Sequence, residues 1–416
     1  MNDVVVSTRL PPGWRIAPLS TVVAEVSGGF SVNCEDRAAM TDEIGVLKTG
    51  AVAYGFFDPS QNKYVIPAEH KRVRTRVSAG SIIFCRKNSE EVVGACALVE
   101  HDQPNLFLSD LLWELRPNRD VSPRWLEALM QSHAVASVVR LRATGTQASM
   151  KNISQDRLLS IEVPIPPSKE QYAIAEILRT WDEAIDACKR QRNAKAKALT
   201  AARQRVYGLD GSPPAKWPSA KLEGIVDRIR RQSDGGNHPV MTISGKSGFK
   251  RQDEKFDRFM AGDSVDRYLL LTRGEFAYNK GNSKTYPQGC IYRLEQDTAL
   301  VPFVYFAFAL RDGLNSDFYA HLFEAGYLNH QLSRLINSGV RNDGLLNIYA
   351  DDFFGCIVPV PPEPEQERIA AFFYLAKQEI VALDKRIDAL RMQKRGLMQK
   401  LLSGEWRVKV DKEAAA

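Results

Sequence analysis

The chain has 416 residues, which is more than one ordinary hydrophobic core accommodates and predicts two globular domains plus connecting elements. Its hydrophobic share of 44% and charged share of 25% are typical of a globular protein, and it has no run of about eighteen apolar residues to span a bilayer. The formal net charge of +6 permits a polyanionic partner such as nucleic acid but does not require one.

The N-terminus lacks the basic region and small-residue cleavage site of a secretory signal, so we expect a cytoplasmic protein. The cysteines are scattered and form no C-x-x-C pair, and no histidine lies at a metal-binding spacing from them. We therefore expect reduced thiols and no metal site. These cysteines are Cys34, Cys85, Cys96, Cys188, Cys290 and Cys356.

Residues 1–165 are predicted to form the first α+β domain. They mix β-rich runs, such as Ser81–Cys85, with helical stretches, such as Pro123–Val139. Basic and amide side chains beside turn-forming residues have the chemistry that reads guanine and adenine and holds phosphates, although a solvated surface has the same composition. The candidate DNA contacts here are Arg72, Arg74, Arg76, Arg86, Lys87, Gln147 and Lys151.

The first domain ends within Val163-Pro164-Ile165-Pro166-Pro167, at residue 165, and a central helix is predicted over 166–208. Alternating steps of four and three residues define a heptad seam, interrupted by Arg192 and Lys195. The basic run between Cys188 and Gly208 fits a solvated face, DNA phosphates or an acidic partner. The apolar seam residues are Ile174, Leu178, Trp181, Ile185 and Leu199.

Residues 209–360 are predicted to form a second α+β domain, with a strand near Gly289–Leu294 and a helical stretch at Pro302–Leu310. It too has basic residues beside turn formers. The candidate DNA contacts are Arg230, Arg231, Lys246, Lys250, Arg251, Lys280, Lys284 and Arg341.

The chain is a tandem repeat. The proline-rich element returns as Val358–Pro362, and Glu170-Gln171 returns as Glu365-Gln366. The two copies agree at their ends and diverge in the middle. This pattern favours a common frame that carries two distinct specificities over an old duplication whose loops have drifted.

A distal helix is predicted over 361–404, and a flexible tail over 405–416. Each long helix has roughly 40 residues and would span about 60 Å. Antiparallel pairing of the two helices buries both seams, whereas the alternative is that each helix packs on its own domain. The distal seam residues are Ile369, Phe373, Ile380, Leu383, Ile387, Leu390 and Leu397.

Catalytic motifs are missing from the sequence. Gly245-Lys246-Ser247 resembles the end of a phosphate-binding loop, but Val240 stands where that loop requires glycine. The chain has no His-Glu-x-x-His, no G-x-S-x-G and no Asn-Pro-Pro-Tyr motif. We therefore expect a protein that is not an enzyme.

The P-x-G-W start and the repeated V-P-x-P-P-x-x-E-Q-x-x-I-A element resemble the specificity subunit of type I restriction-modification systems. The second copy departs from the pattern because Lys216 precedes Trp217 where the first copy has Gly13 before Trp14. The resemblance implies two similar α+β target recognition domains separated by two long antiparallel helices that form a coiled-coil spacer, in a pseudo-twofold tandem repeat.

The same resemblance implies a bipartite double-stranded DNA target, with one half-site for each domain and a gap set by the helical spacer. It implies methyltransferase subunits, expected to be two, and motor-nuclease restriction subunits as partners. S-adenosylmethionine, ATP and Mg are then expected in those partners, with no cofactor bound by this chain. The alternative hypothesis is a coiled-coil adaptor that links two protein-binding domains without contacting DNA.

Overall fold

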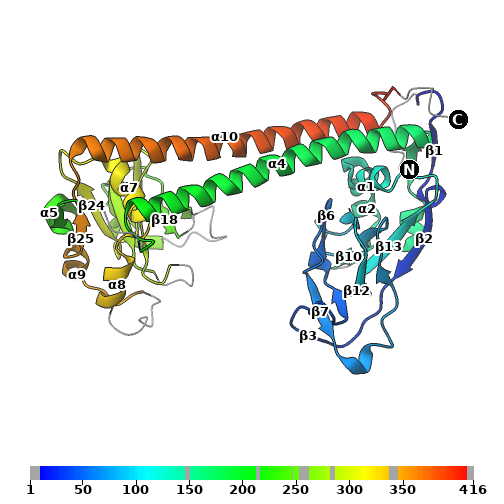
Figure 1. Ribbon diagram of the computed structural model, residues 1–416, viewed down its shortest axis with the longest axis horizontal. Coiled ribbons are helices and arrows are strands. Elements are labelled where there is room, and N and C mark those ends of the chain that lie inside the picture. The colour runs from blue at the N-terminus through cyan, green and yellow to red at the C-terminus, as the bar shows by residue number, and fades with distance from the viewer. Residues whose placement is uncertain are drawn as a thin grey trace. The chain divides into compact units, whose positions relative to one another are not determined.

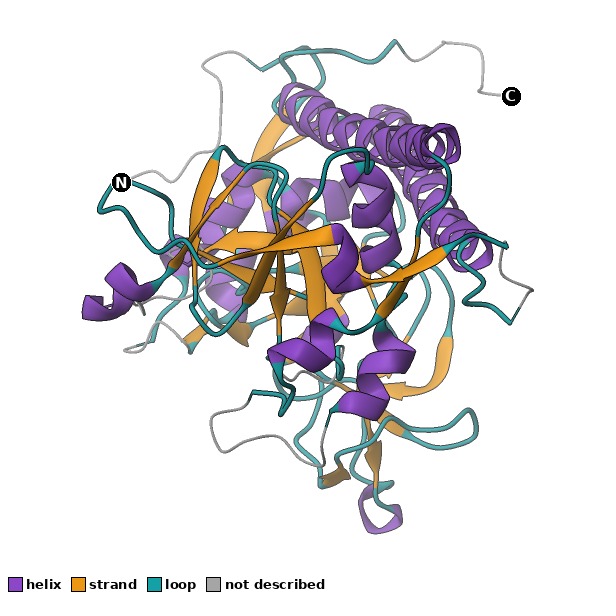
Figure 2. Ribbon diagram, turned by 90° about the vertical axis from the view of Figure 1, so that its left-hand side faces the viewer, coloured by secondary structure: helices purple, strands orange, loops and turns teal. Residues whose placement is uncertain are grey.

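The computed structural model describes residues 10–145, 150–211, 216–245, 247–252, 262–281, 286–336 and 345–409. The chain forms two compact units. Unit 1 comprises residues 1–188 and 386–416, and unit 2 comprises residues 189–385. Each unit contains strands, short helices and part of both long helices. Figure 2 draws the helices in purple and the strands in orange. The expected α+β class is therefore confirmed.

The central sheet of unit 1 has four strands in the order β11-β9-β13-β2. Neighbouring strands are antiparallel, and Trp113 on β13 lies opposite Phe84 of β9 on one side and Gly28 of β2 on the other. The strands are β2 (Val23–Gly28), β9 (Ile82–Cys85), β11 (Cys96–Leu98) and β13 (Leu112–Pro117).

A second, five-stranded sheet in unit 1 has the order β3-β7-β4-β12-β8. Its strands are β3 (Cys34–Glu35), β4 (Gly45–Leu47), β7 (Asn62–Val65), β8 (Arg76–Val77) and β12 (Gln103–Phe107). Three short antiparallel pairs complete the strands: β1 (Arg15–Pro18) with β15 (Glu162–Ile165), β5 (Val52–Ala53) with β6 (Phe56–Phe57), and β10 (Lys87–Asn88) with β14 (Lys151–Asn152).

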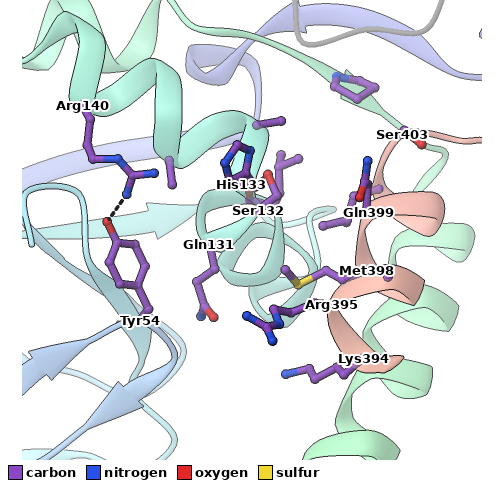
Figure 3. A pocket seen from close by; sticks show the side chains of 16 residues that line it. Tyr54, Gln131, Ser132, His133, Arg140, Lys394, Arg395, Met398, Gln399 and Ser403 are labelled. Atoms are coloured by element: carbon purple, nitrogen blue, oxygen red, sulfur yellow. Dashed lines mark hydrogen bonds between the residues drawn. The ribbon is translucent and has the colours of Figure 1, made fainter. Parts of the chain in front are cut away.

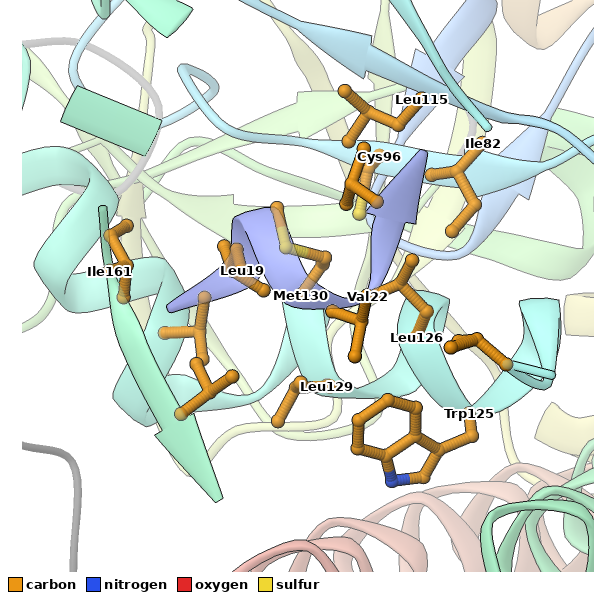
Figure 4. Close-up of a cluster of buried hydrophobic side chains, with 14 of the residues drawn as sticks. Leu19, Val22, Ile82, Cys96, Leu115, Trp125, Leu126, Leu129, Met130 and Ile161 are labelled. Atoms are coloured by element: carbon orange, nitrogen blue, oxygen red, sulfur yellow. The ribbon is translucent and has the colours of Figure 1, made fainter. Parts of the chain in front are cut away.

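The helices α1 (Pro123–Gln131), α2 (His133–Arg142) and α3 (Gln155–Leu159) pack against the four-stranded sheet. The hydroxyls of Ser122 and Ser132 accept hydrogen bonds from backbone N–H groups in the first turns of α1 and α2, so each serine fixes where its helix begins. Figure 4 shows part of the resulting core, in which Met130 of α1 lies beside Leu19 and Val22.

Unit 2 repeats this plan. Its four-stranded sheet has the order β22-β21-β24-β17, which matches β11-β9-β13-β2 strand for strand. Its strands are β17 (Val226–Ile229), β21 (Phe276–Asn279), β22 (Cys290–Arg293) and β24 (Phe306–Leu310). The other pairs are β16 (Ser219–Lys221) with β25 (Ile357–Pro359), β18 (Met241–Ser244) with β19 (Gly248–Arg251), and β20 (Leu269–Thr272) with β23 (Thr298–Val301). The helices are α5 (Leu222–Ile225), α7 (Ser316–Glu324), α8 (Asn329–Leu335) and α9 (Ala350–Phe354).

The prediction of a helix at Pro302–Leu310 is wrong, because residues 306–310 form β24. Phe306 and Phe308 alternate with alanines, which is the two-residue period of a strand. The strand pairs on both sides, with β17 and with β21. Tertiary pairing therefore overrides the helical tendency of the alanines.

The two long helices are α4 (Ser168–Val206) and α10 (Glu363–Leu402), and they lie along each other in Figure 1. In unit 1, Ile185 and Cys188 contact Ile387, and Lys394 Nζ is 2.6 Å from Asp182 Oδ1. As the residue number rises along α4 from Asp182 to Cys188, the contacting residue number on α10 falls from Lys394 to Ile387. The two helices are therefore antiparallel. The expected pairing of two long helices is confirmed.

The basic residues that interrupt the seam of α4 have acidic partners on α10. Within unit 2, Arg192 Nε lies 3.0 Å from Asp384 Oδ1, and Lys195 Nζ lies 2.6 Å from Glu379 Oε2. Part of the basic run between Cys188 and Gly208 is thus engaged within the chain. The apolar seam positions are all buried or half-buried: Ile174, Leu178, Trp181, Ile185 and Leu199 on α4, and Ile369, Phe373, Ile380, Leu383, Ile387, Leu390 and Leu397 on α10.

The repeated Glu-Gln motif forms the same hydrogen bonds in both units. Gln171 donates to the Pro166 carbonyl and accepts from the backbone N–H of Ser122, the N-cap of α1. Gln366 donates to the Pro361 carbonyl and accepts from the N–H of Asn315, the N-cap of α7. Each glutamine therefore ties the start of a long helix to the start of a short helix in its domain.

The glutamate of the motif has different surroundings in the two copies. Glu170 is buried, and its carboxylate accepts from Trp14 Nε1 at 2.9 Å and from Arg407 Nε at 2.8 Å. Glu365 is half-buried and pairs with Arg368 on the same helix at 3.4 Å. Residues 405–409, expected to belong to a flexible tail, are thus held against unit 1 through Arg407, and residues 410–416 lie outside the described residues.

The ends of the long helices also enter their domains differently. In unit 2, the Arg203 guanidinium near the end of α4 lies 2.7 Å from His321 Nδ1 and 2.9 Å from Glu324, both on α7. Burial, followed by the Arg203 charge, lowers the pKa of His321 to about 3. In unit 1, the residues at matching places of α10 and α1 are uncharged: Met398, Ala128 and Gln131.

Arg407→Ala is expected to destabilise unit 1 by about 3 kcal/mol, because it leaves the buried Glu170 carboxylate with Trp14 as its partner. Arg368→Ala is the matched control, since it removes the arginine partner of Glu365 in the other copy. That change is expected to stay within about 0.5 kcal/mol. Urea unfolding followed by tryptophan fluorescence measures both, and equal losses would contradict the role assigned to Arg407.

Unit 2 is expected to lose about 2 kcal/mol of stability between pH 7 and pH 5 because of His321. The folded pKa lies below the ordinary value of 6.5, so this contribution is complete above that value and is lost as the pH falls toward 3. Lys377, Asp317 and Arg293 also act on this pKa. Unfolding midpoints are measured from pH 7 to pH 5. The midpoint should change little with pH in His321→Gln and should fall as in the wild type in the exposed control His330→Gln. A wild-type pH dependence of the midpoint in His321→Gln would refute the role assigned to His321.

Candidate nucleic-acid interface

In unit 1 the candidate residues gather at one end of the four-stranded sheet, where β9 ends and β13 begins. We call the surface formed by Arg86, Lys87, Trp113 and Lys151 the unit 1 basic edge. The guanidinium carbon of Arg86 lies 5.3 Å from the Trp113 ring centroid, and the Arg86 carbonyl accepts from Ile153 N–H at 3.1 Å. Arg86 is thus held by an aromatic ring on one side and by returning backbone on the other.

The β10–β14 pair places Lys87 opposite Asn152 and Asn88 opposite Lys151. Lys151 Nζ donates to the Gly145 carbonyl at 3.2 Å, just before residues 146–149. Two buried polar atoms here, Arg86 Nε and Asn152 Oδ1, have no hydrogen-bond partner. Unsatisfied buried polar atoms are uncommon in folded proteins and require an explanation such as a ligand.

The basic run at 71–76 adjoins the same edge. The Thr75 hydroxyl donates to the Gly28 carbonyl at 2.6 Å, and Gly28 lies opposite Trp113 in the sheet. Arg72 lies over the Phe30 ring at 5.2 Å while pairing with Glu69, and Arg76 lies 5.7 Å from the Phe107 ring. A chain of contacts therefore joins this run to Arg86. Arg74 is exposed.

Unit 2 has an equivalent surface, the unit 2 basic edge, formed by Asn279, Lys280, Phe306 and the β18–β19 hairpin. Lys280 follows β21 as Arg86 follows β9, and its Nζ lies 5.1 Å from the ring centroid of Phe306 on β24. The Lys280 carbonyl accepts from Leu346 N–H at 2.8 Å. Asn279 Nδ2 donates to the Ile243 carbonyl at 3.0 Å, which ties the hairpin to this edge.

The remaining candidates of unit 2 have different surroundings. Lys250 and Arg251 are exposed on β19, and Arg230 is exposed at the end of β17. Arg231 is bound to the Leu270 carbonyl and to Glu275, so its side chain supports the local fold. Four candidates lie outside the described residues: Gln147, Lys246, Lys284 and Arg341. Direct DNA contact stays a prediction for all of these residues.

Sequence analysis missed Trp113 and Phe306, the aromatic rings beneath the two cations. Each lies on a strand far along the chain from the cation that it supports, and no local pattern marks it. The alignment of β9 with β13, and of β21 with β24, brings each pair together.

A separate cavity of about 860 Å³ lies in unit 1 between the α1–α2 turn and the end of α10 (Figure 3). Tyr54 and Arg140 close one side through a hydrogen bond of 3.1 Å. Lys394, Arg395 and Met398 come from the helix, and none of the described residues that line the cavity is acidic. The candidate DNA contacts lie elsewhere.

Among the described residues, no group of three or more histidine, cysteine or acidic side chains is arranged to hold a metal ion. Within the same ranges, no helix combines the length and the apolar character needed to cross a membrane. All six cysteines are free thiols.

Comparison with known proteins gives consistent matches. Residues 44–198 match the family model for the type I restriction modification DNA specificity domain. The EcoKI specificity subunit of Escherichia coli is 23% identical, over 96% of this chain and 89% of that protein. The putative MjaX specificity subunit of Methanocaldococcus jannaschii is 22% identical, over 96% and 95%. The match to the EcoEI subunit of Escherichia coli is 26% identical and spans 44% of this chain and 31% of that protein.

Solved structures share the fold. One comes from a study of complex assembly and conformational transition of the type I restriction-modification system, with a TM-score of 0.59, 17% identity, and coverage of 96% of this chain and 100% of that one. Another is the type I system S subunit from M. genitalium, with a TM-score of 0.52, 14% identity, and coverage of 96% and 98%.

Two repeated β-rich domains on paired long helices are the architecture of this chain, and each domain has a basic edge. Residues 44–198 match the type I restriction modification DNA specificity domain, and type I specificity subunits are similar to this chain over 96% of its length. The relatives that span nearly the whole chain are specificity subunits of type I restriction enzymes. This similarity favours DNA specificity over the hypothesis of an adaptor without DNA contact.

Proposed function

We propose that the chain recognises a bipartite double-stranded DNA target, with one half-site bound at the basic edge of each unit. One observation carries the proposal: both units place a cation over an aromatic ring at the same end of the same four-stranded sheet. The frame behind each edge is repeated, while the loops beside it differ between copies. A common frame with different loops suits two half-sites of different sequence.

The chemistry of the edges supports this assignment. Lysine and arginine neutralise phosphates, arginine and lysine donate to guanine, and asparagine and glutamine pair with adenine. Exposed Arg74 and Arg230 fit phosphate contacts, because solvated cations bind the backbone without sequence preference. Arg72 and Arg231, which have carboxylate partners, position the surrounding loops.

The reactions belong to partner subunits in this proposal. The chain acts in the cytoplasm and brings two methyltransferase subunits, which bind S-adenosylmethionine, to adenines in the recognised target. Restriction subunits that use ATP and Mg join the same complex for cleavage. This chain recognises the DNA target and binds none of these cofactors.

The methyltransferase subunits are proposed to dock on the paired helices. Phe372 and Leu375 are exposed on neighbouring turns of α10 and form an apolar surface. The cavity beside Arg140 and Arg395 has apolar walls and positive charge, which suit an acidic segment of such a partner. Exposed apolar surface of this kind is typical of protein interfaces.

The helix pair is further proposed to set the gap between the half-sites. Adding one heptad to both helices, at the Cys188–Arg192 turn of α4 and the matching Asp384–Ile387 turn of α10, lengthens each by about 10 Å. The methylated motif should then gain about three unread base pairs, given 3.4 Å per pair. Seven residues inserted in the exposed turn at Gly313 are the control and should leave the gap unchanged. An unchanged gap in a folded, active heptad variant contradicts the proposal.

The function itself is tested by copurifying the chain with the products of neighbouring genes and sequencing methylated DNA from cells that carry it. A two-part methylated motif that vanishes on deletion is the expected result. DNA binding by the purified complex should also weaken steeply as salt rises. No methylation change, together with no methyltransferase in the complex, would refute the proposed function.

A further inference from the structure

The two basic edges contain one pair of equivalent positions. Arg86 is the first residue after β9, and Lys280 is the first residue after β21. Both strands occupy the same place in the matched sheets, flanked by β11 and β13 in one unit and by β22 and β24 in the other. Topology therefore assigns the same location to the two cations.

The supports of the two side chains are also matched. The ring beneath each cation comes from the neighbouring strand, and the ring-to-cation distances are 5.3 Å for Arg86 and 5.1 Å for Lys280. Each backbone carbonyl accepts from the segment that returns to the repeated frame, through Ile153 or Leu346. Such stacking restricts a long side chain and leaves its donors directed past the ring.

Arg86 carries a further sign of a ligand. It is half-buried, its Nε has no hydrogen-bond partner, and no carboxylate of the described residues lies within ion-pair distance. Asn152 Oδ1, on the adjoining β14 strand, is an unsatisfied acceptor close by in the fold. A base edge supplies acceptors for a guanidinium and donors for an amide.

From these matched features, and resting on the proposed function, we infer that Arg86 and Lys280 are the equivalent base-reading residues of the two half-sites. Arg86 reads guanine through two parallel hydrogen bonds, because its planar fork matches O6 and N7. Lys280 contacts its base as a point charge with rotatable donors. The same frame position then gives different selectivity in the two units.

The test uses the complete complex with its methyltransferase partner and the wild-type methylated motif as reference. Arg86→Met and Lys280→Met retain an unbranched stem over the ring and remove the donors. Each should relax one base position in its own half-site, with discrimination there falling roughly 10- to 100-fold. The other half-site should stay unchanged. Arg86→Lys should weaken guanine preference without abolishing binding.

Lys377→Met, an exposed lysine of α10, is the control for loss of one positive charge. Duplexes with each base pair of the motif replaced in turn measure discrimination, and salt titration measures phosphate contacts. If a variant loses the same binding affinity for every duplex, and the slope of log affinity against log salt falls by about one, the residue contacts a phosphate. That result overturns the inference. Full discrimination in folded Arg86→Met also overturns it while leaving the proposed function intact. Absence of any motif with the wild-type chain refutes the proposed function itself.

Discussion

Burial of the two apolar helix seams is the constraint on which the rest of the structure depends. A helix of about 40 residues that exposed Ile174, Leu178 and Ile185 to water would not be stable by itself. Pairing α4 with α10 removes both seams from water, and the antiparallel direction brings the end of each helix to the start of the other. Arg192 and Lys195 are compatible with this pairing because Asp384 and Glu379 lie opposite them.

The same pairing explains why the repeat is strict in some places and variable in others. Gln171 and Gln366 must meet the N-cap of a short helix in the same geometry, so the Pro-Pro and Glu-Gln elements recur. Among the described residues, the end of each four-stranded sheet that holds the basic edge makes no hydrogen bond with these glutamines. It is free to differ, and it is there that Arg86 and Lys280 are held over Trp113 and Phe306.

Much of the fold could be predicted from the sequence, because its signals are local or repeated. The heptad spacing and the prolines before each helix identify α4 and α10 to within a few residues. The strand β24 was mistaken for a helix because its alanines favour helix and its pairing with β17 and β21 is long-range. The boundary between units falls within both helices, which a linear division into domains and spacers does not express.

The candidate site was predictable in composition but not in arrangement. Basic residues beside turns mark Arg86 and Lys280, yet the same pattern marks Arg231, whose side chain is bound to Glu275. The distinction depends on partners that are distant in sequence. The ion pair between Arg407 and Glu170 could not be predicted for the same reason, since 237 residues separate the two.

The unequal ends of the long helices also bear on how a duplicated chain avoids misassembly. Arg203 at the end of α4 needs His321 and Glu324, whereas the matching places in unit 1 hold Ala128 and Gln131 around Met398. Seated in the other domain, Arg203 would lose both of these partners, at a cost of about 3 kcal/mol or more. Unit 1 is thus expected to disfavour the end of α4, both during folding and in exchange of helices between two copies of the chain.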